Sequence, residues 1–528
     1  MMNLIRKSTA YVCRLADQYP SGALLAFSLV YFPGATWLAA VRPMWADEFF
    51  TLYIARSASI RGVFDAILTG ADQHPPSFYL FSRALFPLLD ANQLSVRLPS
   101  VLGYWLMSLC LYALVSRRTT PSVGLIALSF PLTTAAYDYA IEGRGYALIM
   151  GFGSLALLCW VVATEDGPRR NVALGGLAFA SAAAVAAHYY AAFFLLGIAG
   201  GEVARTVARG RVDTKVWASL STSLLPIAVF LPHIRSAAGW AQNFWARPTW
   251  QDAPRFYSFL LDPASLAIVL VLMVIVVSAL LSTTPRRPVP MDRFSPFHWW
   301  ELVAICLIVA LPFLEVSAAQ LLHGGFAPRY ALPSVIGVAI LVALLIPAMA
   351  SHMPSAVGGV LVVLGGVFVC RQFTEAGRAS ATAVYLGRTS AWILASGAHD
   401  LPIATWHSQG FLQLGYYGNP AITSRIVYLA DPEIALRVNK HDTVDRGFLA
   451  LRPWFPNGIR EYKAFIREHR EFLAYGYTGD IAQTGRPWNW LLGALTRDNA
   501  TVRLLASAGD EMLFLVAFPD ANEGDVTE

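Results

Sequence analysis

A succession of long apolar segments takes up most of residues 1–370 and constrains the fold more than any other feature. A helix needs about 20 apolar residues to cross the roughly 30 Å hydrocarbon core of a bilayer. Eleven segments approach or meet this length, and we expect each to span a membrane: 21–41, 99–116, 121–138, 146–163, 172–187, 190–204, 216–232, 264–282, 301–322, 331–350 and 355–370. The pattern predicts a polytopic α-helical membrane protein.

Charged residues are scarce, at 14% of the chain, against about 25% in soluble proteins. Their density nearly doubles after Cys370, with 41 in residues 1–370 and 32 in residues 371–528. We therefore predict two domains with these bounds. Residues 371–528 alternate strand-like and helical segments, which favours a small α/β domain with a largely parallel sheet. The strand-like segments are LPIATW, SRIVYLAD, GFLALRPW, TVRLLAS and EMLFLVAF, and the helical ones are SQGFLQLGYYG, PEIALRV and REYKAFIREHREFLAYG.

The distribution of Lys and Arg between alternate loops predicts the orientation, because cytoplasmic loops are enriched in these residues. One set of connecting segments, which includes residues 1–20 and 202–215, holds 14 basic residues, and the alternate short loops hold five. The N-terminus is therefore expected in the cytoplasm, with the first loop, 42–98, and residues 371–528 on the external face. Within this loop, 49–62 and 77–89 read as amphipathic helices that lie in the interface. We attribute the net charge of +5 to the membrane topology of the chain and not to nucleic-acid binding.

The first external loop contains two clusters of ionisable residues. Asp47 and Glu48 stand side by side beyond the first span, where acids are costly and are often functional. The structural alternative is that Asp47 caps the helix that follows it. Asp72 and His74 lie at a turn whose two prolines set the start of a helix from Ser77. His74 could orient a carboxylate, donate to a phosphate or bind a metal.

Other ionisable residues lie at the predicted external ends of spans. Arg97 stands at the mouth of the second span, where a snorkelling arginine is the alternative. Glu142 and Arg144 follow the third span, and a structural ion pair between them is an alternative. Arg329, in a Gly- and Pro-containing loop before the tenth span, matches the geometry of a phosphate. We expect His188 to be structural, and the role of Glu315, inside the ninth span, stays open.

Carboxylates and arginines thus converge on one face of a helical domain. The combination suits a general base that faces a hydroxyl, with cations that hold an anionic leaving group. The sequence contains no P-loop, HExxH helix or GxSxG elbow. For the C-terminal domain, which lacks a Gly-rich phosphate loop after its first strand, we expect a capping role and no catalytic one.

The motifs WADEFFT, DQHPPSFYLF, VRLPSVLG, EGRGYAL and PRYALPS, in this order, resemble those of the GT-C superfamily of polyprenyl-phosphate-sugar-dependent glycosyltransferases. Within it, the chain is similar to the branch of protein O-mannosyltransferases, aminoarabinose transferases and Rgt-like enzymes. The resemblance covers about residues 21–350 and is most specific in the first three motifs. In the C-terminal domain it extends only to the general layout.

The resemblance implies an enzyme of the bacterial inner membrane that transfers a sugar from a polyprenyl-phosphate donor to a hydroxyl of a cell-envelope glycan or lipid, with inversion, on the periplasmic side. Asp47 matches the catalytic aspartate, Glu48 its acidic neighbour, and Arg97 and Arg329 the arginines that hold the donor phosphate. The remaining substrate-binding candidates are His74, Glu142, Arg144, Tyr146 and Tyr330. Many relatives carry an apolar residue or Asn in place of His74, which leaves its role open. A divalent metal held by Asp47, Glu48, Asp72 and His74 is also left open.

Two other function classes fit the span count. The first is a secondary transporter or lipid flippase, which the eleven spans and Glu315 favour. Transporters of this size usually show inverted repeats and broken midplane helices, and neither is evident in the sequence. The second is an inactive scaffold, against which the intact acid and arginine motifs argue.

Overall fold

The computed structural model describes residues 2–165, 167–280, 297–349, 353–398, 400–477 and 490–519. The chain divides into two compact units. The helical unit contains Met1–Ala40, His74–Leu231 and Pro248–Ala376, and the mixed unit contains Val41–Gln73, Pro232–Arg247 and Gly377–Glu528. Apart from Val41 and Pro232, which end two predicted spans, all three segments of the mixed unit lie in regions predicted to be external.

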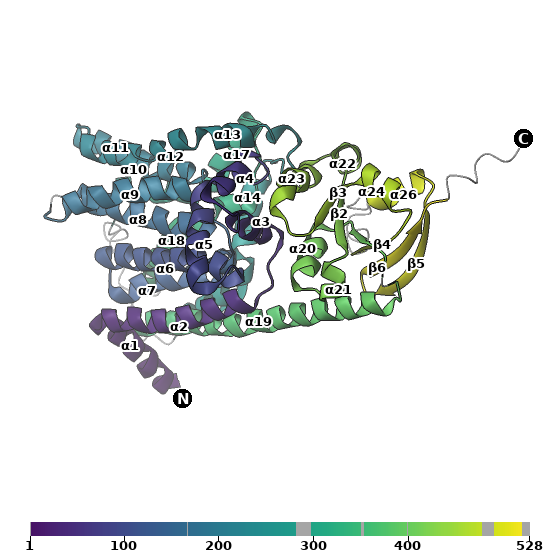
Figure 1. Cartoon of the computed structure of the whole chain (residues 1–528). Coiled ribbons are helices and arrows are strands. Elements are labelled where there is room, and N and C mark those ends of the chain that lie inside the picture. The colour runs from purple at the N-terminus through teal and green to yellow at the C-terminus, as the bar shows by residue number, and fades with distance from the viewer. Residues whose placement is uncertain are drawn as a thin grey trace, which may run out of the picture. The chain divides into compact units, whose positions relative to one another are not determined.

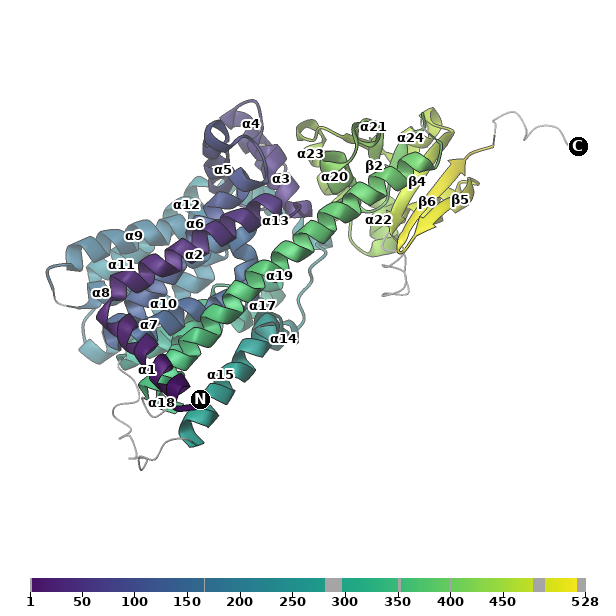
Figure 2. The same ribbon diagram turned by 90° about the horizontal axis from the view of Figure 1, so that it is seen from below.

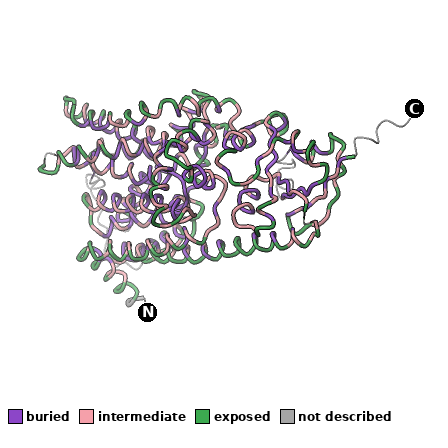
Figure 3. Tube along the Cα trace, viewed as in Figure 1, coloured by how far each residue is buried: buried purple, intermediate pink, exposed green. Residues whose placement is uncertain are grey.

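The helical unit is a bundle in which α6 packs against α7 and α8, and α8 against α9 (Figure 1). In the same unit, α10 packs against α16. Its buried residues are concentrated where these helices meet (Figure 3). The α-helices are α1 Met2–Gln18, α2 Pro20–Val41, α5 Pro76–Leu89, α6 Gln93–Arg118, α7 Pro121–Ser129, α8 Tyr146–Thr164, α9 Arg170–Ala187, α10 Ala191–Arg209, α11 Thr214–Ser221, α12 Leu224–Val229, α14 Asp252–Leu261, α15 Ser265–Leu280, α16 Trp299–Val309, α17 Leu311–Leu321, α18 Ser334–Met349 and α19 Pro354–Ala395. Short 3-10 helices are η1 Phe130–Thr133, η2 Ala135–Ile141, η4 Asp262–Ala264 and η6 Pro328–Ala331.

Helices occupy all eleven predicted spans, although residues 281 and 282 of the eighth span and residue 350 of the tenth lie outside the described residues. Among the described residues, seven helices are long and apolar enough to cross a membrane, or up to nine if each of two bent pairs is one span. Two shorter apolar helices cover 121–133 and 334–349. The prediction of a polytopic helical protein is confirmed.

Two pairs of apolar helices are bent at a short break, a feature that was not evident in the sequence. The helix over 214–229 bends by 64° at its junction with α13 (Leu231–Ala238), and α16 bends by 56° into α17. Pro232 and Pro312 each occupy the second position of the helix after the bend. A proline there lacks the N–H that a continuous helix would bond and clashes with the preceding turn, which accounts for both breaks.

The last predicted span continues well past its expected end, because α19 is one helix of 42 residues (Figure 2). The domain boundary predicted after Cys370 lies inside it, and the helical unit extends to Ala376. Arg371 explains the extension, because its guanidinium donates to Asp138 (2.7 Å) and to the carbonyl oxygen of Thr134 (2.6 Å). This arginine therefore belongs to the bundle.

The mixed unit contains a six-stranded sheet of order β3-β2-β1-β4-β6-β5. The first four strands in this order are parallel, and β6 and β5 form an antiparallel edge. The bounds of its elements are α3 Ala46–Ala55, α4 Ile60–Leu68, α13 Leu231–Ala238, η3 Ala241–Asn243, β1 Ile403–Thr405, α20 Ser408–Tyr417, α21 Pro420–Thr423, β2 Ile426–Ala430, α22 Pro432–Asn439, α23 Thr443–Leu451, η7 Arg452–Trp454, β3 Gly458–Glu461, α24 Tyr462–Glu468, β4 Glu471–Tyr477, α26 Leu491–Arg497, β5 Thr501–Ala508 and β6 Glu511–Ala517.

The predicted α/β domain with a largely parallel sheet is confirmed, with two corrections. The segment GFLALRPW, predicted as a strand, forms the end of α23 and a 3-10 turn, because its apolar residues Phe448 and Leu451 lie on one buried helical face. The end of the predicted helix REYKAFIREHREFLAYG forms β4, whose residues 472–476 are all buried. Short apolar segments do not distinguish a buried strand from a buried helix by their period.

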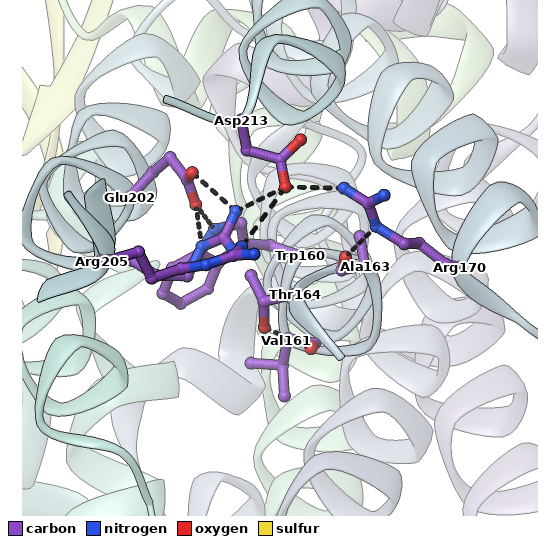
Figure 4. A network of polar contacts seen from close by, with 9 residues as sticks. Trp160, Val161, Ala163, Thr164, Arg170, Glu202, Arg205 and Asp213 are labelled. Carbon is purple, nitrogen blue, oxygen red and sulfur yellow. Dashed lines mark hydrogen bonds and ion pairs between the residues drawn. The ribbon is translucent and has the colours of Figure 1, made fainter. Parts of the chain in front are cut away.

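Ion pairs tie the helices together away from the predicted site. Arg205 in α10 lies between Glu202 and Asp213, with Nη2 at 2.8 Å from a carboxylate oxygen of each (Figure 4). Arg170 joins Asp213 at 2.6 Å, and Trp160 in α8 donates to Glu202 at 2.9 Å. The network thereby connects α8, α9, α10 and the loop before α11.

Candidate functional site

The paired acids of the first loop lie at the start of α3 in the mixed unit and differ in environment. Helix α3 begins at Ala46, with Trp45 as its N-cap residue. Glu48 is fully buried, and its Oε2 accepts from the backbone N–H of Trp45 at 3.1 Å. Capping therefore falls to Glu48 and not to Asp47, which lies half-buried in the first turn. Asp47 keeps its carboxylate at the positive end of the helix dipole.

Helix α3 is held by the C-terminal domain within the mixed unit. Gln409 Oε1, in α20, accepts from the backbone N–H of Ala46 at 2.6 Å, and Gln413 Nε2 donates to the carbonyl oxygen of Met44 at 2.9 Å. Tyr417 accepts from the N–H of Met44 at 3.0 Å. The residues that precede Asp47 are thus bonded directly to α20.

Aromatic contacts reinforce this attachment. Phe49 lies against Tyr416 with ring centroids 5.6 Å apart, and Tyr53 lies 4.9 Å from Phe455. The interfacial segment predicted over 49–62 is two helices, because Ser59 caps α4 by accepting from the N–H of Gly62. Asp72 follows α4 and is buried in the mixed unit.

A group of aromatic and histidine rings forms the candidate site of the helical unit. The ring centroids of His74 and His188 are 4.6 Å apart, and each lies 5.4–5.5 Å from the ring of Tyr146. His74 Nε2 is 3.5 Å from the Tyr146 hydroxyl. His74 lies just before α5, Tyr146 begins α8 and His188 directly follows α9. The group therefore combines residues that are far apart in the sequence.

A close backbone approach allows this arrangement. A Cβ atom at Gly145 would lie 2.6 Å from the carbonyl oxygen of Ala187, the last residue of α9. The glycine before Tyr146 therefore lets the start of α8 meet the end of α9. Pro75 and Pro76 start α5 as predicted, and Ser77 ties it to α9 by donating to the carbonyl oxygen of Ala186 at 2.7 Å.

Arg329 adds a cation to this group. Its Nε donates to the Tyr146 hydroxyl at 2.9 Å, and its guanidinium lies 5.9 Å from the ring centroid of Tyr330. The ring of Tyr330 in turn lies 5.6 Å from His188 and 4.6 Å from Tyr190. Arg329 is only partly buried, unlike His74 and Tyr146 beside it.

The surroundings of His74 keep its imidazole neutral. Burial, followed by the cationic Arg144, by His188 and by Arg329, holds the pKa of His74 well below its usual value near 6.5. A neutral imidazole has one N–H donor and one ring acceptor. His74 is therefore suited to hydrogen bonding and not to supplying a positive charge.

The other predicted residues of the helical unit are buried. Arg97 is fully buried in α6, and its Nη1 donates to the carbonyl oxygen of Ala39 at 2.8 Å, so the snorkelling alternative is wrong. Glu142 and Arg144 are also buried. Ser100, one turn of α6 beyond Arg97, donates to the carbonyl oxygen of Arg144 at 2.9 Å. Helix α6 thus positions the EGRG turn directly.

The sequence did not reveal two members of the group. His188, expected to be structural, contacts His74, Tyr146 and Tyr330. Its Nδ1 accepts from the N–H of Tyr190, which assigns the ring proton to Nε2. Tyr190 donates to the carbonyl oxygen of Gly325 at 2.6 Å and so joins α10 to the loop of Arg329. The adjacent HYY residues between two short spans were the available signal.

Glu315 is buried in α17, and within the described parts of the chain neither of its carboxylate oxygens has a hydrogen-bond partner. It lies near Tyr190. The described residues include no group of three or more His, Cys, Asp or Glu side chains placed to hold a metal ion.

The fold and the buried His, Tyr and Arg group define a polytopic membrane protein with a polar site in its helical unit. Residues 73–235 match the model of the dolichyl-phosphate-mannose-protein mannosyltransferase family. The match confirms, for this part of the chain, the resemblance to the GT-C glycosyltransferases that the motifs indicate. It includes five of the predicted site residues, His74, Arg97, Glu142, Arg144 and Tyr146.

Among solved structures, the chain is similar to ArnT from Cupriavidus metallidurans in the apo state and bound to undecaprenyl phosphate. Each comparison has a TM-score of 0.45 and 12% sequence identity, and covers 95% of this chain and 100% of that chain. No curated protein sequence matches this chain.

Proposed function

We propose that this protein is a membrane glycosyltransferase that moves a sugar from a polyprenyl-phosphate donor to a hydroxyl of a cell-envelope glycan or lipid. The observation that carries the proposal is the match of residues 73–235 to a family named for transfer from a dolichyl-phosphate sugar. Dolichyl phosphate is a polyprenyl phosphate, and the donor of this chain would share its lipid-phosphate chemistry.

In the proposed reaction, Asp47 is the general base. Its carboxylate takes the proton of the acceptor hydroxyl while that oxygen attacks the anomeric carbon of the donor sugar. The bond between the anomeric carbon and the phosphate oxygen breaks, and the polyprenyl phosphate leaves with the electron pair. One displacement inverts the anomeric configuration. The partial exposure of Asp47 in the first turn of α3 supports this assignment.

The arginines would stabilise the leaving phosphate. Arg329 is partly exposed and is oriented by its hydrogen bond to Tyr146, which suits a guanidinium that receives an anion. Arg97 and Arg144 would contribute positive potential from buried positions. Glu142, Tyr146, Tyr330 and neutral His74 would bind or orient the donor. Glu48 would act by fixing the first turn of α3.

We place the reaction on the periplasmic side of the bacterial inner membrane. The segments of the mixed unit, which carries Asp47, come almost entirely from regions that the basic-residue distribution predicts to be external. The described ion pairs of Arg170, Arg205 and Arg117 lie in or beside segments predicted to be cytoplasmic. The acceptor would then be a component of the cell envelope.

Comparative mass spectrometry of envelope lipids and glycans, from cells with and without the gene, tests the proposal. We expect one glycan or lipid to lose a single sugar when the gene is absent and to regain it on complementation. An unchanged set of envelope glycans and lipids would contradict the transferase proposal.

A lipid or glycan flippase is the second candidate, because two spans are bent and Glu315 is buried without a described hydrogen-bond partner. The two functions differ in their products. In proteoliposomes, a flippase moves a labelled donor lipid between leaflets without cleaving it, whereas the transferase releases polyprenyl phosphate.

A further inference from the structure

The C-terminal domain contains a pocket of its own, with a volume of about 330 Å³. It lies wholly within the segment 377–528 of the mixed unit. Most of its described lining residues are aromatic, acidic or otherwise polar, and they include Trp406, Ser408, Tyr428, Asn439, Asp442 and Trp490. The volume is at the lower end of the range of small-molecule sites in proteins.

The topology of the sheet places this pocket where open α/β sheets bind ligands. The chain passes from β1 to β2 and β3 in one direction and then returns to β4 on the other side of β1. The reversal makes the carboxyl end of β1 a topological switch point, outside which such sheets form binding crevices. Trp406, His407 and Ser408 directly follow β1, and Tyr428 lies in β2 level with the last residue of β1.

One carboxylate of the pocket is used to fix its aromatic walls. Asp445 accepts from the Tyr428 hydroxyl at 2.7 Å, from Trp490 Nε1 at 2.6 Å and from the N–H of Asp431 at 3.1 Å. These three bonds satisfy the buried carboxylate and hold the phenol and the indole in place. The walls of the pocket are therefore preorganised.

The second carboxylate of the pocket, that of Asp442, has fewer hydrogen bonds than that of Asp445. Asp442 is 9% exposed, and in the described parts of the chain its Oδ1 has no hydrogen-bond partner. Its Oδ2 has a long contact of 3.4 Å with Asn243. The adjacent His441 likewise has a buried Nδ1 without a described partner. A buried acceptor without a partner is costly, and a ligand donor toward which the Asp442 side chain turns would relieve that cost.

The residue types that line the pocket indicate the chemical class of that ligand. Neither Lys nor Arg is among the described lining residues, so the pocket is not built for a phosphate. Indole and phenol rings offer apolar faces, whereas Asp442, Asn439 and Ser408 offer acceptors and donors around them. A pyranose has this combination of an apolar C–H face and a rim of hydroxyls. We propose that this pocket is a saccharide-binding site that holds one sugar unit of an envelope glycan.

The saccharide class follows from the pocket alone, and only the assignment to an envelope glycan rests on the proposed function. The two proposals are therefore separable. A site of this kind on the domain that carries α3 would retain a glycan acceptor on the protein between encounters with a donor, at a raised effective concentration.

Binding can be measured with the full-length chain in lipid nanodiscs. The probes are the methyl glycosides of glucose, mannose, galactose and N-acetylglucosamine, each titrated by isothermal calorimetry and observed by saturation-transfer difference NMR. Ethanolamine serves as a probe for an amine site. We expect at least one glycoside to bind and Asp442→Asn to weaken it about tenfold or more, because a charge-assisted hydrogen bond is lost. Asn439→Ala, at the end of α22, should weaken the same glycoside.

Asp400→Asn, an exposed acid of the same domain outside the pocket, is the matched control and should bind as the original chain does. Asp47→Asn should also bind the glycoside normally, which separates this site from the proposed catalytic base. The inference is wrong if no glycoside binds, if ethanolamine alone binds, or if Asp442→Asn and Asn439→Ala bind like Asp400→Asn while their melting temperatures are unchanged. Glycoside binding in a chain without transferase activity would uphold the pocket and contradict the proposed function.

Discussion

His74 shows how burial sets the properties of a single residue at this site. Its imidazole is enclosed by His188 and Tyr146, with Arg144 and Arg329 as cationic neighbours. Both burial and positive charge disfavour the protonated ring, so the pKa of His74 is lower in the folded chain than in the unfolded one. The turn that carries His74 was evident from the sequence, but these neighbours come from loops far along the chain.

This environment predicts a pH dependence of stability. Below about pH 6.5 the unfolded chain binds a proton at His74 that the folded chain does not, so the free energy of unfolding should fall as the pH falls. The loss from this group approaches about 1.4 kcal/mol per pH unit. Thermal unfolding between pH 7.5 and 5 should show a smaller drop for His74→Asn than for the original chain. Identical slopes for the two proteins would contradict the depressed pKa.

Substitutions of the two adjacent acids, Asp47 and Glu48, should affect the stability of the protein differently. Glu48→Ala removes the capping bond to Trp45 and should lower the stability by about 1 kcal/mol, whereas Glu48→Gln keeps an acceptor and should lower it less. Asp47→Asn removes a negative charge from the positive end of the helix dipole and should lower the stability by less than about 1 kcal/mol. The motif WADEFF located the pair, but only the first turn of α3 distinguishes the capping acid from its neighbour.

At the scale of elements, α20 of the C-terminal domain holds the segment that leads into α3. Gln409 forms a hydrogen bond with Ala46, which is 363 residues away in the sequence. Gln413 forms one with Met44, which is 369 residues away. The sequence predicted that this domain caps the external face, without any indication of what it contacts. Such long-range partners cannot be read from local patterns, whereas the helices of the bundle follow directly from apolar length.

We expect the double substitution Gln409→Ala and Gln413→Ala to loosen the start of α3 while the sheet stays folded. Two lost hydrogen bonds cost about 2 kcal/mol locally. Hydrogen exchange of residues 46–55 should accelerate by more than tenfold, and sugar transfer should fall with it. Glu433→Gln, an exposed change in α22, is the control. Unchanged exchange in α3 would show that α20 does not hold it.

The network of Glu202, Arg205 and Asp213 gives a prediction for the helical bundle. Arg205→Met leaves the fully buried Glu202 without its guanidinium, which should destabilise the protein by about 3–5 kcal/mol. Adding Glu202→Leu should restore most of the melting temperature, because no uncompensated charge then remains. If Arg205→Met alone unfolds at the original temperature, the network is not structural.

For the whole molecule, the positions of Lys and Arg predict on which side each loop lies. In a chain whose five cysteines have been replaced, single cysteines at positions 65 and 400 should react with a membrane-impermeant reagent from outside intact spheroplasts. A cysteine at position 211 should react only after permeabilisation. The reverse pattern would overturn the orientation.

The architecture was largely predictable from the sequence, because apolar length and charge density report on the whole chain. All eleven spans correspond to helices, and the sheet is largely parallel as expected. The bends at Pro232 and Pro312, the helix formed by GFLALRPW and the length of α19 were missed, because each depends on packing or on a single backbone group. The same holds for His188 and Tyr190 in the site.

The role proposed for Asp47 is that of the base in a sugar transfer from a polyprenyl phosphate. The most direct measurement is the release of polyprenyl phosphate and the formation of glycosylated acceptor by purified protein in nanodiscs, with the donor and acceptor that mass spectrometry identifies. Asp65→Asn, a surface acid of the same loop, is the matched control. We expect Asp47→Asn to lose at least 100-fold in rate, within the range that general-base catalysis contributes, while it stays folded and while Asp65→Asn keeps full activity. Full activity of Asp47→Asn would show that Asp47 is not the base.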